Sequence, residues 1–204
     1  MSAVQIPPGG TIVQTFKKSF TDVPIGADNS ISTTEFLDAA ESLTTIFDVL
    51  GSVAFSPVKN DLGGNIKKLR DRQLAAPAES ETIQALVKNE LATKKHVATE
   101  GLLWLVRGLE FTCLGLKANV ANPSEELADS FRNAYGSTLK PHHSFIVKPI
   151  FSAAMSACPY RKDFYPKLGA DQAKVNEEMA AYLAALEKVV GILKEFVNSK
   201  EAKW

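Results

Sequence analysis

The sequence has no run of 18 apolar residues, so none of its segments is expected to span a membrane as a helix. It also has no excess of charge: 23 lysine and arginine residues balance 23 aspartate and glutamate residues, which argues against a nucleic-acid partner. The opening MSAVQIPPGG lacks the basic and apolar regions of a secretion signal. The two cysteines, Cys113 and Cys158, lie in apolar periodic segments, which indicates buried thiols and a reducing, cytoplasmic setting.

Motifs for catalysis and metal binding are also missing. The adjacent His142 and His143 do not have the spacing of zinc ligands. No nucleophile-elbow pattern is present, and Gly63-Gly64 lacks the preceding strand and the following GK[ST] of a phosphate-binding loop. We therefore expect no metal, no cofactor and no enzymatic activity. A hydrolase built on His143 and Asp61 is the weakest alternative.

Helical periodicity extends over nearly the whole chain. A chain of 204 residues is most simply one domain, here 1–204. A short first helix is expected over Ile12–Phe20, and a capping box at Ser32–Glu35 predicts a helix that continues to Leu50. Residues 95–117 are apolar almost all round, which is typical of a helix at the centre of a bundle. With about eight helices and no convincing strand, the predicted class is all-α.

Two further helices are expected near the C-terminus. Pro149 lies inside an apolar segment, Ser144–Ala157, and should either kink that helix or mark its true start. A long helix is predicted from Asp171 to about Asn198.

Three polar residues form one stripe on a predicted helix. Asp61, Asn65 and Lys68 follow one another at i, i+4 and i+7, within about 60° of one another around the helix axis. Gly63 and Gly64 lie between them, although each costs about 1 kcal/mol relative to alanine in a helix interior. The glycines suggest that something approaches this backbone closely. A solvated helix face with a break at the glycines remains the alternative.

Trp104 lies in the most apolar segment, with Arg107 three residues further on. It is either a core tryptophan or an aromatic surface at a pocket entrance, where a sugar ring could stack beside Asp, Asn and Lys side chains. The eleven phenylalanines could likewise fill a core or line an apolar channel, because both give the same periodicity.

Three segments resemble the glycolipid transfer protein family in order and spacing, and look closest to its fungal heterokaryon-incompatibility members: FDVLGSVAFSPVKNDLGGNIKKL, ATEGLLWLVRGLEF and LKPHHSFIVKPIFSAAMSACPYRKDF. The similarity covers roughly Phe36 to Leu193. It implies a two-layer, all-α fold enclosing one glycosphingolipid, and non-enzymatic transfer of that lipid between membranes.

The resemblance also implies roles for single residues. Asp61, Asn65 and Lys68 would hydrogen-bond the sugar, Trp104 would stack on it, and His143 would bind the ceramide amide with help from Asp61. The expected lining of the chain pocket is apolar: Phe36, Phe47, Leu50, Val53, Phe55, Phe151, Met155, Phe164, Leu183 and Leu186.

The membrane contact is expected at Phe145 and Lys148. Here the sequence departs from the family pattern, because His142 replaces a tyrosine and Phe145 replaces a tryptophan. Phe145 would insert without an interfacial N–H donor.

Two alternatives stay open besides the hydrolase. Ceramide-1-phosphate would need cations, for which Lys68 and Arg107 are available, but Trp104 and Asn65 favour a sugar. A glycolipid sensor that does not act mainly as a carrier would share the same site. The expected partners are a glycosphingolipid and, transiently, a membrane surface, and nothing requires more than a monomer.

Overall fold

A computed structural model describes residues 5–204 of the chain. This range contains nine α-helices, six short 3₁₀ turns and no strand. The α-helices are α1 (Thr33–Leu43), α2 (Thr45–Leu50), α3 (Ser56–Ala75), α4 (Ile83–Ala92), α5 (Val97–Ala121), α6 (Leu127–Ser137), α7 (Val147–Ser156), α8 (Arg161–Phe164) and α9 (Gln172–Asn198). Because α8 is a single turn of four residues, eight longer helices remain, and the predicted all-α class is confirmed.

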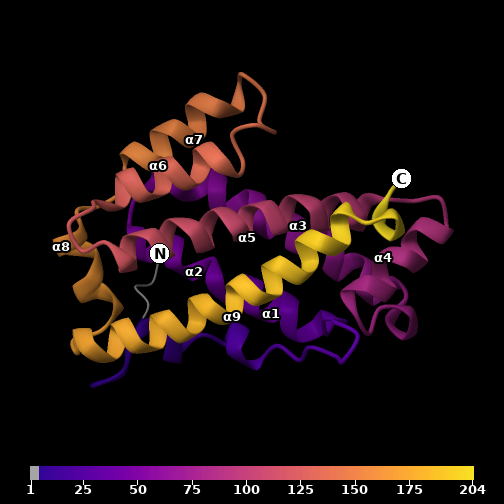
Figure 1. The fold of residues 1–204 in the computed structure, drawn as a ribbon, viewed down its shortest axis with the longest axis horizontal. Coiled ribbons are helices and arrows are strands. Elements are labelled where there is room, and N and C mark those ends of the chain that lie inside the picture. Colours follow the sequence, from indigo (N-terminus) through magenta and orange to yellow (C-terminus); the bar gives the residue numbers. More distant parts are fainter. Residues whose placement is uncertain (1–4) are drawn as a thin grey trace.

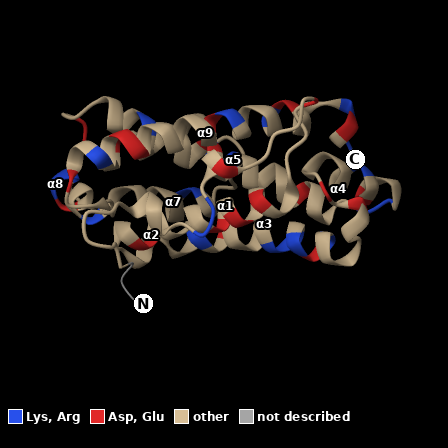
Figure 2. Cartoon of the chain, turned by 90° about the horizontal axis from the view of Figure 1, so that it is seen from below, with Lys and Arg blue, Asp and Glu red and all other residues tan. Residues whose placement is uncertain are grey.

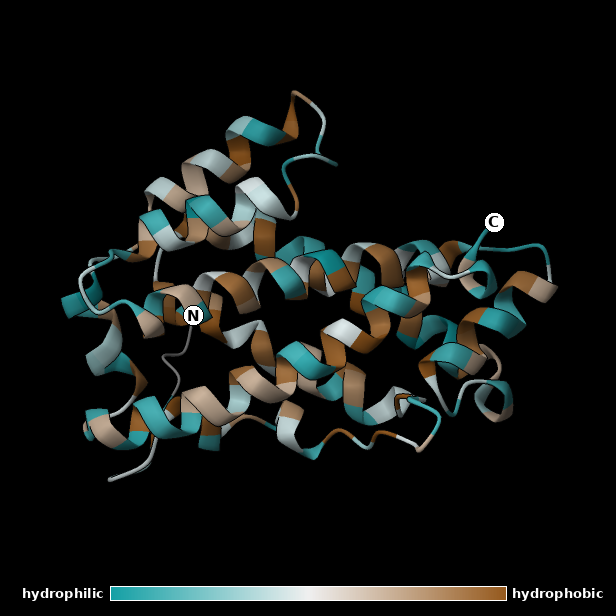
Figure 3. Ribbon diagram, viewed as in Figure 1, coloured by the Kyte–Doolittle hydropathy of each residue, from teal (hydrophilic) through white to brown (hydrophobic). Residues whose placement is uncertain are grey.

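The helices form two layers. In Figure 2, α5 and α9 lie in one layer and α1, α2 and α3 in the other. Helix α5 packs against α3, α6 and α9, while α6 and α7 lie side by side at one edge of the molecule (Figure 1). Hydrophobic and hydrophilic stretches alternate along the helices (Figure 3), which lets each helix contribute to one interior. A single cluster of buried apolar residues extends from Ile12 to Ala202.

The central position predicted for the apolar segment 95–117 is confirmed, and α5 is buried around most of its circumference. Its first turn begins at a buried carboxylate. Glu90 on α4 accepts hydrogen bonds from the backbone N–H groups of Ala98, at 2.8 Å, and Thr99, at 2.7 Å. These donors have no partner within the helix, so Glu90 satisfies them and its negative charge faces the positive end of the helix dipole.

The predicted helix from the capping box to Leu50 is interrupted. The side chains of Thr44 and Thr45 each donate a hydrogen bond of 2.7 Å to the backbone carbonyl three residues earlier, where the chain divides into α1 and α2. The capping box also differs from expectation. The Ser32 hydroxyl donates to the Glu35 carboxylate instead of accepting from a backbone N–H, and the Thr33 N–H is bonded to the Glu81 carbonyl.

The first predicted helix, Ile12–Phe20, is wrong. The segment contains only two 3₁₀ turns, Ile12–Thr15 and Phe20–Asp22, and it is held by α9 instead of by its own helical bonds. Thr11 donates a hydrogen bond to Glu178, and Gln14 donates one of 2.6 Å to the same carboxylate. Tertiary contacts therefore decide the conformation of this apolar segment.

Proline marks the start of α7. The helix begins at Val147, so Pro149 lies in its first turn, where its missing N–H would have no helical partner. Of the two outcomes predicted for Pro149, the true start is confirmed. The C-terminal prediction also holds, because Asp171 caps α9 by accepting from the N–H groups of Ala173 and Lys174, at 3.0 and 3.1 Å.

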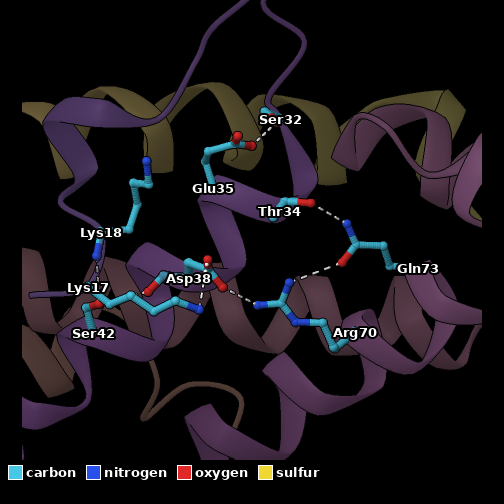
Figure 4. A network of polar contacts seen from close by, with 9 residues as sticks. All are labelled: Lys17, Lys18, Ser32, Thr34, Glu35, Asp38, Ser42, Arg70 and Gln73. Carbon is cyan, nitrogen blue, oxygen red and sulfur yellow. Dashed lines mark hydrogen bonds and ion pairs between the residues drawn. The ribbon is translucent and has the colours of Figure 1, made fainter.

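A network of charges joins the N-terminal segment, α1 and α3 (Figure 4). The Asp38 carboxylate of α1 pairs with Arg70 of α3 at 2.7 Å and with Lys17 at 3.1 Å. One turn away, Gln73 donates a hydrogen bond of 2.7 Å to Thr34. These contacts hold α1 against α3 at the surface, above the apolar interior.

Every helix within residues 5–204 is too short or too polar to cross a bilayer. The assignment of residues 1–204 to one domain stays a prediction, and its first four residues lie outside the described part of the chain.

Candidate functional site

The polar stripe predicted on α3 is continuous in the structure. Asn65 is 4% exposed and its amide donates to the Asp61 carbonyl oxygen at 3.0 Å. The Lys68 ammonium donates to the Asn65 side-chain oxygen at 3.2 Å. Burial raises the pKa of Asp61, and the nearby Lys68 opposes that rise. The three side chains form a half-buried polar surface able to offer both donors and acceptors.

The close backbone approach occurs at other glycines than those predicted. No atom would lie within 4 Å of a Cβ added to Gly63 or Gly64, which are exposed. On α5, by contrast, a Cβ on Gly101 would lie 3.1 Å from the Lys68 Cβ, and one on Gly108 would lie 2.6 Å from a methyl group of Leu62. Glycines of α5 therefore allow α5 to pack closely against the polar stripe of α3.

Trp104 lies on α5, one turn after Gly101, and is half-buried. Its indole ring stacks on the His143 ring, with centroids 5.7 Å apart and an interplanar angle of 22°. The Arg107 guanidinium lies 4.9 Å from the centre of the indole ring, and the His142 ring meets it edge-on at 6.5 Å. The tryptophan is therefore packed against the core but not enclosed by it, with polar groups around its ring. Its interpretation as an aromatic surface at a pocket entrance stays a prediction.

His143 is held by Tyr135, which the sequence analysis missed, and by Phe151, which it expected only in the lining of the chain pocket. The Tyr135 hydroxyl of α6 lies 3.1 Å from the His143 Nδ1, and the Phe151 ring of α7 meets the imidazole edge-on at 4.4 Å. Tyr135 is buried at the end of the apolar face of α6, just before the link that carries His143, and that position is the signal that could have identified it. In the described part of the chain, Asp61 and His143 make no direct hydrogen bond.

In the described structure, the basic side chains of the polar stripe and around Trp104 are not paired with carboxylates. Within residues 5–204, Arg107, His142, His143, Lys148 and Lys68 take part in no ion pair. Burial lowers the pKa of His143, and the neighbouring His142, Lys148 and Arg107 lower it further. Burial and Arg107 also lower the pKa of His142. Both imidazoles are therefore neutral at pH 7, when they can accept as well as donate hydrogen bonds.

The two cysteine thiols are protonated, and the described residues include no cluster of metal ligands. Burial raises the pKa of both cysteine thiols, Cys113 and Cys158, to about 12, so both are protonated at neutral pH. Among the described residues, no three His, Cys, Asp or Glu side chains are grouped so as to hold a metal ion.

Nine of the ten residues expected to line a chain pocket are buried in the interior: Phe36, Phe47, Leu50, Phe55, Phe151, Met155, Phe164, Leu183 and Leu186. The tenth is misplaced, because the Val53 side chain is 80% exposed. Val53 opens a 3₁₀ turn, Val53–Phe55, in which successive side chains diverge by about 120°. Phe55 points inward there, and Val53 consequently points outward.

Exposed apolar side chains gather at the end of the link between α6 and α7 and in the first turn of α7. Phe145 is 82% exposed, Ile146 64% and Ile150 45%. The turn that carries Val53 packs against α7, so Val53 belongs to the same side of the molecule. In Figure 1 the link projects beyond the helices at the top of the view.

The comparison with known families agrees with this arrangement. The sequence model of the family described as Glycolipid transfer protein (GLTP) matches residues 31–170. A curated glycolipid transfer protein from Aureobasidium melanogenum is 65% identical over 198 residues, which cover 97% of this chain and 98% of the relative. The chain belongs to the glycolipid transfer protein family.

Solved structures of the family have the same fold. HET-C2, a fungal glycolipid transfer protein, is 70% identical and superposes with a TM-score of 0.93, covering 95% of this chain and all of that chain. FAPP2, studied for how it selects simple glycosphingolipids using the GLTP-fold, is 34% identical, with a TM-score of 0.83 over 92% of this chain and 94% of that one. The mouse ceramide-1-phosphate transfer protein shares the fold alone, at 21% identity and a TM-score of 0.80 over 92% of this chain and 95% of that one.

Proposed function

We propose that this family member carries glycosphingolipids between membranes without making or breaking a covalent bond. The observation that carries the proposal is that α5 packs against the polar stripe at Gly101, one turn before the half-buried Trp104, above a buried apolar interior. A sugar presents C–H bonds on its ring faces and hydroxyl groups at its edges. An indole ring and adjacent amide, ammonium and carboxylate groups are complementary to both surfaces.

In this proposal, Asp61, Asn65 and Lys68 hydrogen-bond the sugar hydroxyls, and Trp104 stacks on the sugar ring. Asn65 is bonded to Lys68 at 3.2 Å, so the two groups approach a ligand as one preformed pair. His143 binds the ceramide amide, and the Tyr135 hydroxyl fixes the orientation of its ring through the contact of 3.1 Å to Nδ1. Asp61, which makes no direct bond to His143, assists from the opposite side of the amide.

The buried apolar residues enclose the hydrocarbon chains. Transferring a chain of 16 carbons into water costs on the order of 12 kcal/mol, at about 0.8 kcal/mol per methylene group. Enclosure removes this cost but recognises no particular lipid. Selectivity must therefore come from the polar stripe, where a ligand lacking the sugar or amide would leave buried groups without partners, at about 1–3 kcal/mol each.

Membrane contact is assigned to the exposed apolar group at the link between α6 and α7. We propose that Phe145 inserts into the bilayer surface and that Lys148 approaches the lipid headgroups. Val53, reassigned from the pocket, adds to this surface together with Ile146 and Ile150. The contact is transient, and the protein acts as a monomer in the cytosol.

A phosphate headgroup is the second candidate, because Lys68 and Arg107 lie at the site without carboxylate partners in the described structure. Two observations favour the sugar. The Arg107 guanidinium lies against the indole ring, and one of the three Lys68 ammonium donors is bonded to the Asn65 amide oxygen, so both cations are only partly available to a phosphate. A sensor that binds the lipid but does not move it would use the same site.

Vesicle transfer tests the proposal. Donor vesicles containing fluorescent glucosylceramide and ceramide-1-phosphate, each with its own label, are mixed with acceptor vesicles, and both labels are followed over time. We expect transfer of glucosylceramide only, and we expect Asp61→Val to abolish it. Asp71→Val is the matched control, because Asp71 lies on the same helix and, within residues 5–204, pairs only with Lys67, at 2.6 Å on the surface. Preferred transfer of ceramide-1-phosphate, binding without transfer, or full activity of Asp61→Val would each contradict the proposal.

A further inference from the structure

Tyr182 carries a buried hydroxyl group that the proposed carrier role does not use. Its side chain lies on α9 and is 0% exposed, and its hydroxyl oxygen has no hydrogen-bond partner within residues 5–204. An unpaired buried hydroxyl costs about 1–3 kcal/mol, which phenylalanine at the same position would avoid. Burial raises the pKa of Tyr182 far above its ordinary value, so the group stays a neutral O–H that can both donate and accept.

The other buried tyrosines differ in this respect. The Tyr165 hydroxyl donates to the Asn119 side-chain oxygen at 2.9 Å, and the Tyr135 hydroxyl contacts His143. The remaining unpaired buried groups, which belong to Thr33, Arg72 and Ser80, lie where α1, α3 and α4 begin or end. Thr33 and Ser80 are equally buried, but among these residues Tyr182 alone lies in the middle of a helix with aromatic rings against it.

The surroundings of Tyr182 connect it with the proposed chain pocket. Its ring contacts Phe16, at 5.2 Å between centroids, and Phe20, at 5.8 Å. Phe20 in turn meets Phe36, one of the proposed lining residues, edge-on at 6.3 Å. On α9, Tyr182 directly precedes Leu183, a second lining residue, and lies one turn before Leu186, a third.

A protein-bound water does not explain this hydroxyl well. A buried water needs two to four polar partners, whereas the rings against Tyr182 are aromatic. The Cys113 thiol of α5 already donates to the Leu183 carbonyl oxygen at 3.7 Å. A partner that arrives with the ligand satisfies the group without requiring further polar side chains.

We propose that Tyr182 forms a second polar subsite, inside the chain pocket, which hydrogen-bonds an oxygen carried on the hydrocarbon chain of the bound sphingolipid. The preferred ligands are thereby sphingolipids with a hydroxyl or keto group within a chain, away from the amide, and plain chains remain ligands of lower affinity. This inference rests on the proposed function, because it requires that the lipid chains enter the interior. The subsite selects among chains, whereas the polar stripe of α3 selects among headgroups.

A positional series of lipids tests the subsite. Galactosylceramides with one 18-carbon acyl chain, either plain or hydroxylated at a single position along it, compete for transfer from one donor vesicle, and mass spectrometry counts each lipid in the acceptor. We expect the wild-type protein to favour one hydroxyl position over the plain chain by about fivefold, the worth of one net hydrogen bond. We expect Tyr182→Phe to lose this preference and to disfavour every hydroxylated chain, since the chain hydroxyl would enter the pocket unpaired.

Tyr165→Phe is the matched control, because it removes a buried hydroxyl that already has a protein partner. It should lower thermal stability and leave the chain preference unchanged, while Tyr182→Phe should unfold at the same temperature as wild type or a higher one. The subsite is wrong if wild type favours no position, if Tyr182→Phe keeps the preference, or if Tyr182→Phe lowers the stability of the lipid-free protein. Failure of the proposed function is distinguishable, because the wild type would then not transfer the plain galactosylceramide either.

Discussion

Two polar clusters on α3 differ in how their charges are paired. Lys68 and Arg70 are two residues apart, so their side chains leave the helix about 200° from each other, on nearly opposite faces. Arg70 pairs with Asp38, which also pairs with Lys17, and each charge in this network has a counterion (Figure 4). Lys68 belongs to the cluster around Trp104, where the cations have no carboxylate partner in the described structure.

The difference separates structural from binding roles. Paired charges on a protein surface satisfy one another, and their contribution ends with holding α1 against α3. Groups that are half-buried and lack counterions still have donors and acceptors that can form hydrogen bonds with a ligand. Changes in the paired network should therefore alter stability, and changes in the Trp104 cluster should alter binding.

The largest effect is expected from Trp104→Ala. Truncating a central aromatic side chain at a binding site typically costs 2 kcal/mol or more, so glucosylceramide transfer should fall by about 30-fold or more. The unfolding temperature should change little, because Trp104 is only half-buried. Transfer between vesicles and thermal unfolding followed by circular dichroism measure the two quantities.

The control for Trp104 is Trp204→Ala, which removes the second tryptophan of the chain. Trp204 is 56% exposed and stacks on His96, so its loss should leave transfer unchanged. Equal loss of transfer in both variants would remove the distinction between the Trp104 cluster and the rest of the surface.

The next largest effect is expected from Lys68→Met, whose transfer rate and stability are compared with those of Arg70→Met. Lys68→Met should lower transfer by about tenfold, the equivalent of one hydrogen bond to a charged group, with little change in stability. Arg70→Met should leave transfer by the folded protein unchanged and reduce the free energy of unfolding by about 1 kcal/mol, because Lys17 still neutralises Asp38 and solvent screens the pair. Urea denaturation measures the stability of each variant, and the vesicle assay measures its transfer rate. Together they test whether Lys68 acts in binding and Arg70 in stability. The comparison would be broken if Arg70→Met lost transfer while remaining folded.

Sequence periodicity predicted the helices and the α3 stripe because both depend on local spacing. Asp61, Asn65 and Lys68 are neighbours on any α-helix, and Asp171 caps α9 with its own side chain. The resemblance to the family then joined Trp104 and His143 to the stripe, which spacing alone left open.

The sequence analysis failed where a contact between distant segments decides the conformation. Ile12–Phe20 has helical spacing but is held against α9 in 3₁₀ turns. The close approach of α3 and α5 depends on Gly101 and Gly108, and no pattern within α3 shows which face α5 will cover. Val53 was misplaced because it lies in a 3₁₀ turn between α2 and α3, whose period differs from that of the α-helices on either side.

A smaller effect is expected from the membrane surface. Phe145→Ala should lower partitioning onto vesicles and the transfer rate by about fivefold, because an 82% exposed phenylalanine gains burial only when it enters the bilayer. Headgroup binding in detergent solution should not change. Leu74→Ala is the control, since Leu74 is 74% exposed on α3 but lies at the opposite end of that helix from α7. Unchanged partitioning of Phe145→Ala in a vesicle sedimentation assay would show that another surface meets the membrane.

The smallest expected effect is a difference between the two clusters in how their contributions to stability depend on pH. His143 has a folded-state pKa below its unfolded value of 6.5, mainly through burial, so its contribution to stability is complete above pH 6.5 and decreases as the pH falls towards the folded pKa. Burial raises the pKa of Asp38, but the hydrogen bonds from Lys17 and Arg70 lower it to below 3.8 overall. The contribution of the network is therefore complete above about pH 4 and is lost only in stronger acid.

Urea denaturation from pH 7.5 to pH 3 should accordingly show two pH ranges in which the free energy of unfolding decreases, one below pH 6.5 and a second, the acid window, in stronger acid. Each decrease should be no larger than about 1 kcal/mol, because solvent screens these groups. The double variant His142→Asn/His143→Asn should flatten the decrease in stability that begins below pH 6.5 and leave the acid window unchanged. Arg70→Met should do the reverse, because Asp38 would then have a folded pKa nearer its unfolded value. If the double variant altered only the acid window, the two faces of α3 would be electrostatically coupled, and the separation between a paired structural network and an unpaired binding cluster would fail.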